Sequence, residues 1–403
     1  MKVTWNHARI ITGNGEVLED ASLSYEGSKI LSVEKQPQDG DIVYDGTGKT
    51  LIPGLFDCHV HLGMEIPGSL VPQQTKDHTE LGARIMKQCL EFPRYGITCV
   101  RNMGTEEDAD ITVKKIIEAT SLPAVRILAS GTAMSITGGH GNPAIGIDSA
   151  DELLKETRRK IKIGADVIKF VVTGGMTTKG SKPRALQYTA EEMTSAVAEA
   201  KLCGKITGAH CTSLEGAKEA IRAGIRSIEH AQLDEETADL MANRIQVDKE
   251  EIFYCPTMVP RYSIIHSTDP DFEWLRKKAD LGDMERKRQA VLLCRERRIP
   301  VCASTDANAP FVGLDALLKE LELYVECGLT EKEAIQTATI NAARLCMLDS
   351  VTGTLEAGKY ADFVVLLANP LEDIRNLRQV EQTIRNGHVL YQREVQQEEL
   401  WIQ

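Results

Sequence analysis

The sequence has no run of 18 apolar residues, which excludes a membrane-spanning helix, and its first residues, MKVTWNHARI, lack the apolar core of a secretory signal. Positive charge is in deficit, because 47 Lys and Arg stand against 59 Asp and Glu and leave a net charge of −12. This balance favours solubility and argues against a nucleic-acid partner bound through its phosphates. We therefore expect neither a membrane nor a nucleic acid among the partners.

None of the ten cysteines forms a CxxC pair, and most of them stand beside Val, Ile and Ala in apolar stretches. This is the pattern of free thiols in a reducing compartment rather than of a disulfide framework, and it predicts a cytoplasmic location. The 403 residues are 42% hydrophobic and 26% charged, which is ordinary for a globular chain that buries a large core without cross-links.

Both ends of the chain alternate short apolar runs with turn residues and show no helical period. The Asn-Gly pair at 386–387 is a typical hairpin turn. We predict one small β-sandwich domain built from residues 1–52 and 350–403, with the main domain, residues 53–349, inserted between them. Chain ends often lie close together, so this topology is accessible.

The middle of the chain alternates strand-like apolar runs with amphipathic helices, which predicts βαβ units and a parallel sheet. The predicted strands are GLFDCHVH (54–61), ITCVRNM (97–103), AVRILASG (124–131), DVIKFVV (166–172), KITGAH (205–210), RSIEHA (226–231), IFYCPT (252–257) and IPVCAST (299–305). Eight such units predict an α/β fold, a closed (β/α)8 TIM barrel. A doubly wound open sheet is the alternative, although the Gly-rich fingerprint usual after its first strand is missing.

Helix start and stop signals fall outside these strands. The predicted capping boxes pair Ser149 with Glu152, Thr189 with Glu192 and Thr330 with Glu333. Gly164 and Gly204 follow the last apolar positions of two helices and are predicted to end them.

Five of the nine histidines stand at the end of a predicted strand or in the loop after one: His59, His61, His140, His210 and His230. In a barrel the carboxyl ends of the strands face one mouth, so these side chains can meet. His59 and His61 lie two positions apart and point to one face, where they can supply two nitrogens to a zinc ion. Surface histidines in a turn are the alternative for this pair, and core histidines bonded to a backbone carbonyl are the alternative for His210 and His230.

Two further residues can complete a metal site. Asp306 follows the eighth predicted strand and is either a helix N-cap or a ligand whose second oxygen carries a proton from water to the leaving group. Lys169 stands inside the apolar strand DVIKFVV, where an unpaired ammonium is costly. A protonated lysine cannot ligate a metal, but its carbamate with carbon dioxide is an anion that can bridge two ions. A buried carboxylate partner for Lys169 is the alternative.

The ordered motifs LIPGLFDCHVH, VIKFVVTGG, GAHCTS, SIEHAQ and ASTDAN resemble those of the amidohydrolase superfamily of metal-dependent hydrolases, and the likeness covers nearly the whole chain. TGGHGN and LTEKEAIQTATINAARL are similar to its imidazolonepropionase-related branch, which contains Xaa-Pro dipeptidase-like and Xaa-Arg/Lys carboxypeptidase-like enzymes. The implied ligands of two Zn²⁺ ions are His59, His61 and Asp306 for one and His210 and His230 for the other, with N-carboxylated Lys169 and a hydroxide bridging them.

The resemblance also implies the reaction. The hydroxide attacks an amide carbonyl polarised by the second metal, and Asp306 passes a proton to the departing amine. The expected substrate is a small molecule, a dipeptide or an N-acyl amino acid. A mononuclear deaminase fits less well, because it would not need Lys169 and usually has a Glu close behind the fifth-strand histidine, whereas Glu215 lies five residues beyond His210.

Other substrates and other roles stay open from the sequence. A cyclic amide, a lactone or an organophosphate ester is the alternative, since the same hydroxide attacks all of them. A non-catalytic scaffold is a third reading, against which six metal-competent groups at strand ends argue. A homo-oligomer is expected from the resemblance alone.

Candidate substrate-binding residues lie in loops. His140 is not needed for the metals and by resemblance contacts a carbonyl oxygen or carboxylate of the substrate, the alternative being a loop histidine without a role. Arg261 and Tyr262 follow the seventh strand and are further candidates. The loop 173–186 contains Lys179, Lys182 and Arg184 and is either a cover that meets a substrate carboxylate or a solvated loop. At Asn102, relatives often have Asp.

Overall fold

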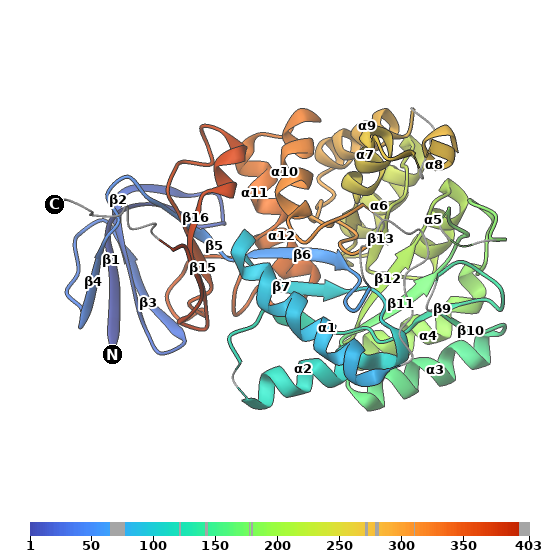
Figure 1. The fold of residues 1–403 in the computed structure, drawn as a ribbon. Helices are drawn as coiled ribbons and strands as arrows, with labels where there is room; N and C mark the ends of the chain where they lie inside the picture. The colour runs from blue at the N-terminus through green and yellow to red at the C-terminus, as the bar shows by residue number, and fades with distance from the viewer. Residues whose placement is uncertain are drawn as a thin grey trace.

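The computed structural model describes residues 1–64, 77–120, 122–141, 144–176, 178, 180–270, 273–278, 282–309 and 311–394. Lys179 and the last nine residues of the predicted composite domain, 395–403, therefore lie outside the described residues. Figure 1 shows a β-rich part that contains the N-terminus and a larger part in which helices surround a set of strands.

The β-rich part joins strands from both ends of the chain. Its strands are β1 (Lys2–Ile11), β2 (Val17–Glu26), β3 (Lys29–Glu34), β4 (Ile42–Asp45), β5 (Thr50–Pro53), β15 (Phe363–Leu366), β16 (Val380–Arg385) and β17 (His388–Gln392). They pair in the order β17-β16-β15-β5-β1-β2-β3, with β4 also on β1, so that β5 from the N-terminal part lies antiparallel to β15. Asn386 and Gly387 have φ values of 51° and 74°, as a two-residue hairpin turn requires. The predicted β-sandwich assembled from both ends is confirmed.

The barrel strands are parallel, and apart from Arg126 and His210 at the ends of two of them their residues are buried, as expected for strands covered on both faces. They are β6 (Leu55–Val60), β7 (Ile97–Asn102), β8 (Arg126–Leu128), β11 (Val167–Val171), β12 (Ile206–His210), β13 (Ser227–Glu229) and β14 (Phe253–Cys255). The ring continues from β8 to β11 because the Ala129 carbonyl accepts hydrogen bonds from the amides of Asp166 and Val167. The predicted TIM barrel is confirmed.

The eighth predicted strand, 299–305, is not a regular strand in the structure, where only Val301 forms a bridge, to Tyr254. The segment nevertheless closes the barrel, because Cys302 N donates to the Tyr254 carbonyl on one side and Cys58 N donates to the Ala303 carbonyl on the other. Ala303 N turns instead to the Thr337 carbonyl. Because the segment divides its hydrogen bonds among three neighbours, no continuous strand ladder forms. The prediction of a regular strand here was therefore wrong, although the segment does occupy the eighth position of the barrel.

Twelve α-helices of the described residues cover the barrel and its loops. They are α1 (His78–Glu91), α2 (Ala109–Thr120), α3 (Ala150–Ile163), α4 (Ala190–Leu202), α5 (Leu214–Arg222), α6 (Glu235–Gln246), α7 (Met258–His266), α8 (Glu273–Lys278), α9 (Gly282–Arg297), α10 (Ala316–Glu326), α11 (Glu331–Thr337) and α12 (Ile340–Leu345). Two short strands that the sequence did not predict, β9 (Ala133–Ser135) and β10 (Ala144–Gly146), follow β8. None of the described helices is long and apolar enough to cross a membrane.

The predicted capping boxes at Thr189 and Thr330 are complete, with side chain and backbone bonds in both directions. At Ser149 only half of the box forms, because the Glu152 carboxylate accepts from Asp148 N instead of Ser149 N. Gly164 ends α3 at φ 105°, as predicted.

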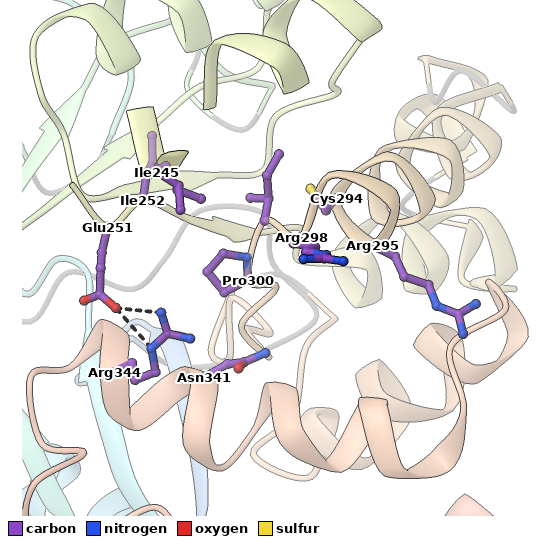
Figure 2. Close-up of a pocket in the computed structure, with 10 residues that line it drawn as sticks. Ile245, Glu251, Ile252, Cys294, Arg295, Arg298, Pro300, Asn341 and Arg344 are labelled. Atoms are coloured by element: carbon purple, nitrogen blue, oxygen red, sulfur yellow. Dashed lines mark hydrogen bonds and ion pairs between the residues drawn. The ribbon is translucent and has the colours of Figure 1, made fainter. Parts of the chain in front are cut away.

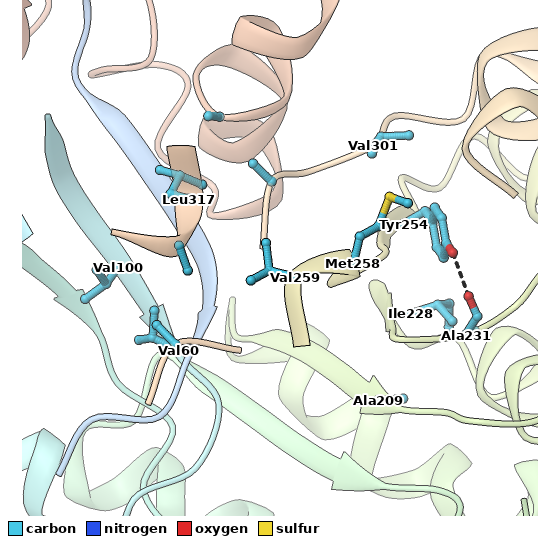
Figure 3. Packing of buried hydrophobic residues seen from close by; sticks show 14 of the residues in the cluster. Val60, Val100, Ala209, Ile228, Ala231, Tyr254, Met258, Val259, Val301 and Leu317 are labelled. Atoms are coloured by element: carbon cyan, nitrogen blue, oxygen red, sulfur yellow. Dashed lines mark hydrogen bonds between the residues drawn. The ribbon is translucent and has the colours of Figure 1, made fainter. Parts of the chain in front are cut away.

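The main core lies between the strands and the helices (Figure 3). Val60, Val100 and Ile228 project from three barrel strands into this layer, and the Tyr254 hydroxyl donates to the Ala231 carbonyl within it. A second apolar cluster contains alternate residues of the same strands, among them Cys58, and lies where the strands begin. A candidate site at the carboxyl ends of the strands therefore rests on a packed floor.

A cavity of about 240 Å³ lies at the opposite end of the barrel (Figure 2). Ile252, just before β14, and Pro300, at the start of the closing segment, line it. Glu251 on its rim pairs with Arg344 at 2.7 Å. Because these residues precede β14 and the closing segment, whose other ends lead to Thr257 and Asp306, the cavity is separate from the candidate site.

Candidate metal centre

A β-bulge aims the first pair of histidines into the barrel. Between Asp57, which pairs with Val100, and Val60, which pairs with Asn102, β6 contains one residue more than β7. Such a bulge re-aims side chains locally. Cys58 faces the apolar floor, while His59 lies on the interior above it and packs its ring 5.3 Å from that of His61.

All five strand-end histidines meet at the mouth of the barrel. Centroid distances of 4.6 Å join His59 to His230 and His140 to His210, and His210 lies 4.7 Å from His230. The rings therefore form one continuous row that begins at His61 and ends at His140. The convergence that the strand positions predicted is present.

Hydrogen bonds fix which nitrogen of the rings faces this space. His61 Nδ1 lies 3.0 Å from the Gly104 carbonyl, which can only accept. His59 Nδ1 lies 2.9 Å from the Glu229 carboxylate. His230 Nδ1 lies 2.6 Å from the Thr257 hydroxyl, which itself donates to the Pro256 carbonyl and therefore accepts from the ring. In each ring the Nδ1 proton is engaged, which leaves Nε2 as the atom available to a metal.

Asp306 completes the group at the end of the closing segment. Its Oδ1 lies 3.5 Å from His59 Nε2 and 3.1 Å from His61 Nε2. His59, His230 and Asp306 each offer one possible ligand atom, and these three atoms all lie within 4.8 Å of one another. Burial disfavours the charged carboxylate, but the neighbouring His61, His59 and Lys169 hold the pKa of Asp306 well below its ordinary range.

Lys169 lies on β11 and is 3% exposed. Burial lowers its pKa to about 8, against the opposing influence of the Glu229 and Asp306 carboxylates. Its Nζ makes no hydrogen bond to any of the described residues. Lys169 thus has two carboxylates, those of Glu229 and Asp306, near enough to favour its charged form but is hydrogen-bonded to neither, so pairing with a buried carboxylate stays an alternative to carboxylation.

The donor set fits a metal cation. Burial lowers the pKa of His59 to about 4 and that of His210 and His230 well below the ordinary range, so these imidazoles are neutral. Within the part of the chain that the structure describes, the buried Nε2 atoms of His59 and His210 make no hydrogen bond. Unsatisfied buried polar atoms cost about 1–3 kcal/mol each. A cation among neutral imidazole nitrogens and the Asp306 carboxylate would satisfy them.

Backbone strain marks the same positions. His230, Thr257 and Asp306 have φ values of 67°, 46° and 61°, in the left-handed region that side chains with a Cβ rarely adopt. Such conformations cost about 1–3 kcal/mol each and cluster at functional sites. The buried Lys287 Nζ donates to the carbonyls of His230 and Pro256 and helps to hold this bend.

Sequence reasoning missed a buried ion pair beneath the histidines. Arg101 on β7 and Glu229 on β13 are both fully buried and lie 2.7 Å apart. Each is a charged residue inside an apolar strand, which is the same signal that singled out Lys169.

His140 lies at the end of the histidine row, against His210. Its Nδ1 is 2.9 Å from the Thr178 hydroxyl, and its backbone amide donates to Gln187 Oε1. A Cβ on Gly175 would lie 2.2 Å from His140 Nε2, so only glycine lets this ring approach. The loop 173–186 thus holds His140.

Arg261 and Tyr262 do not join the histidine row. Both stand on α7, where Arg261 pairs with Asp283 at 3.0 Å and contacts Met176 Sδ, while Tyr262 stacks on His266. In the loop 173–186, Lys182 and Arg184 are exposed.

Asn102 has a structural role. Its Oδ1 accepts from Leu62 N, and its Nδ2 donates to Thr105 and to the buried Asp110. It ties the turn after β6 to the turn after β7.

Comparison with known proteins identifies the family. Residues 50–390 match the model of the amidohydrolase family, and the chain belongs to this family. Ochratoxinase from Aspergillus niger is 30% identical over 93% of this chain and 83% of its own length. Imidazolonepropionase from Sphingopyxis alaskensis is 25% identical over 96% and 98%. The solved structure of a Xaa-Pro dipeptidase with methionine bound in its active site is similar at a TM-score of 0.86 and 28% identity, over 97% of this chain and 100% of that one.

The family and the branch that the motifs predicted are thereby confirmed. The protein is a metal-dependent amidohydrolase, a hydrolase of carbon–nitrogen bonds that acts on small molecules, and its metal site includes a His/His/Asp group.

Proposed function

We propose that this protein hydrolyses a dipeptide or an N-acyl amino acid at two zinc ions held at the mouth of the barrel. One observation carries the proposal: histidines from separate strands converge with Lys169 and Asp306 on a space where buried nitrogen atoms have no hydrogen-bond partner among the described residues. A non-catalytic scaffold would not require such an arrangement.

The proposed ligands of the two ions are His59, His61 and Asp306 for one and His210 and His230 for the other, with N-carboxylated Lys169 between them. Asp306 supports this division, because its Oδ1 faces the Nε2 atoms of the first pair. The Lys169 ammonium first loses one proton to give the amine, and addition of the amine to carbon dioxide releases a second proton. Carboxylation thus converts a buried cation into an anion with two oxygen ligands. It thereby gives the unpartnered Nζ a function.

When bound, the cations would lower the pKa of a water molecule and polarise the amide carbonyl. Asp306 Oδ2 accepts no hydrogen bond from the described residues, and it would take a proton from the attacking water and deliver it to the leaving nitrogen. His140 would bind the substrate carbonyl or carboxylate through Nε2, because Thr178 engages its Nδ1.

Apolar side chains at the mouth support a substrate with an apolar group. Ile264 of α7 packs with Met176 from the loop after β11 and with Phe311 from the segment after Asp306. Arg261 and Tyr262 precede Ile264 on the same helix and would contact the substrate from this side. The similar Xaa-Pro dipeptidase with methionine in its active site also favours a peptide-type substrate.

The test is a substrate panel for zinc-loaded protein. Release of free amino acid is the readout for peptides and N-acyl amino acids, and the ring-opened or hydrolysed product, detected by mass spectrometry, is the readout for the other compounds. Dipeptides and N-acyl amino acids with apolar side chains form one arm, and cyclic amides, lactones and organophosphate esters form the other. The similarity to imidazolonepropionase makes a cyclic amide the second candidate. Turnover confined to the second arm would contradict the proposal, as would full activity of the chelated protein.

A further inference from the structure

A fully buried hydrogen-bonded network lies directly beneath His59. Arg101 donates from Nη1 to the Ser227 hydroxyl at 2.7 Å, from Nη2 to Glu229 Oε1 at 2.7 Å, and from Nε to the Cys58 carbonyl at 2.5 Å. Ser227 also donates to Glu229 Oε1, at 2.5 Å. The network joins β6, β7 and β13 just below the level of the metal ligands.

Glu229 is the member that reaches the metal centre. Its Oε1 is taken by Arg101 and Ser227, and its Oε2 lies 2.9 Å from His59 Nδ1. A carboxylate held by a guanidinium can only accept from His59. The His59 ring therefore keeps its proton on Nδ1 and presents the bare Nε2 to the mouth of the barrel.

We infer that Glu229 is a positioning residue that sets the tautomer and the direction of His59 for metal binding, and that Arg101 and Ser227 set Glu229. The inference rests on the metal centre proposed above. A carboxylate behind a histidine ligand raises the basicity of the ligand and fixes its ring.

The geometry favours this role over a contribution to stability. A buried ion pair is often no more stabilising than apolar residues of the same size, because both ions lose their hydration. Here the pair is surrounded by the apolar floor of the barrel. Besides contacts to other barrel strands, at Cys255 and Thr207, the network bonds to a proposed metal ligand, His59.

The variant Glu229→Gln tests the inference. Because Arg101 offers only donors, the amide oxygen must face Arg101, and the amide NH2 then faces His59 Nδ1. His59 would have to accept at Nδ1 and carry its proton on Nε2, where the metal binds. We expect zinc affinity, measured by competition with a chromophoric chelator, to fall about 10–100-fold.

Asp362→Asn is the matched control. Asp362 is also a buried carboxylate, 3.4 Å from an arginine, Arg126, and it accepts from Asn386 N, but it lies in the β-rich part of the chain. The Asp362→Asn variant should have a lower melting temperature than the wild type but an unchanged zinc affinity. Ser227→Ala removes one hydrogen bond to Glu229 and should weaken zinc binding less than Glu229→Gln does. It allows the inference to be tested even if Glu229→Gln folds poorly.

Nitrogen-15 NMR of metal-free, histidine-labelled protein reads the tautomer directly. The inference predicts His59 protonated at Nδ1 in the wild type and at Nε2 in Glu229→Gln. Unchanged zinc affinity, or a His59 that keeps its tautomer in the variant, would overturn it. A wild type that binds no zinc would overturn the proposed function, while the NMR measurement still decides the role of Glu229.

Discussion

Replacing Lys169 by methionine distinguishes the contribution of this side chain to metal binding from its effect on the free energy of unfolding. Burial lowers the Lys169 pKa from its ordinary 10.5 to about 8. Since one pKa unit corresponds to about 1.4 kcal/mol, the ammonium costs the metal-free protein on the order of 3 kcal/mol at pH 7. Methionine has a similar length and no charge. We expect Lys169→Met to raise the free energy of unfolding of the metal-free protein by about that amount.

The pH dependence has a definite sign. The destabilisation by the buried Lys169 ammonium is fully present below the folded-state pKa of about 8, where the lysine is protonated in both the folded and the unfolded protein. As the pH rises from there to the ordinary value, only the unfolded chain keeps the proton, so the stability of the wild type rises. The difference between wild type and Lys169→Met should therefore narrow over this range in urea unfolding curves of chelator-treated protein.

The same substitution should abolish metal-dependent turnover and lower the zinc content, because the bridge between the ions is lost. In Lys169→Ala, added short carboxylic acids should restore part of the turnover by placing a carboxylate in the vacated space. Lys160→Met is the control: Lys160 is equally buried but bonded to Asp108 at 3.2 Å, so its loss should destabilise the fold and leave zinc binding intact. Two metals and full activity in Lys169→Met would contradict the bridging role of Lys169, and a metal-free variant less stable than the wild type would contradict the cost assigned to its burial.

Three further outcomes are expected. Asp306→Asn should fold normally but lose about 10²–10⁴-fold in kcat, and an unchanged kcat would remove Asp306 from proton transfer. Gly175→Ala should displace the His140 ring and lower kcat/KM at constant zinc content, whereas Gly82→Ala, where a Cβ meets nothing within 4 Å, should not; equal activities of the two variants would contradict a role for His140. Zinc at 100 times its dissociation constant should stabilise the apoprotein by about 2.7 kcal/mol per independent site in thermal unfolding, and no shift in melting temperature would speak against a preformed site.

The barrel could be predicted because seven of its strands are continuous apolar runs bounded by turn or helix signals. The closing segment 299–305 has the same composition, but it divides its hydrogen bonds among β14, β6 and Thr337, which depends on tertiary packing. The strands β9 and β10 are each three residues long, too short for a periodic pattern to show.

The histidines, Lys169 and Asp306 could be placed together because the carboxyl ends of parallel strands share one mouth. Arg101 and Glu229 carry the same sequence signal as Lys169, but their pairing depends on the register of three strands and on the bulge at Cys58–His59, which the sequence does not reveal. The direction of α7, and with it the position of Arg261, depends on loop geometry that no local pattern determines.

The proposed reaction depends on a pair of ions bridged by a carboxylated lysine. Anomalous diffraction at the zinc edge, from crystals grown with zinc and bicarbonate, can locate both ions and show the state of the lysine. We expect two peaks, one among His59, His61 and Asp306 and one beside His210 and His230, with density for three extra atoms on Lys169 Nζ between them. Density for an unmodified amine at Lys169, with no zinc peak among these histidines, would contradict the proposal.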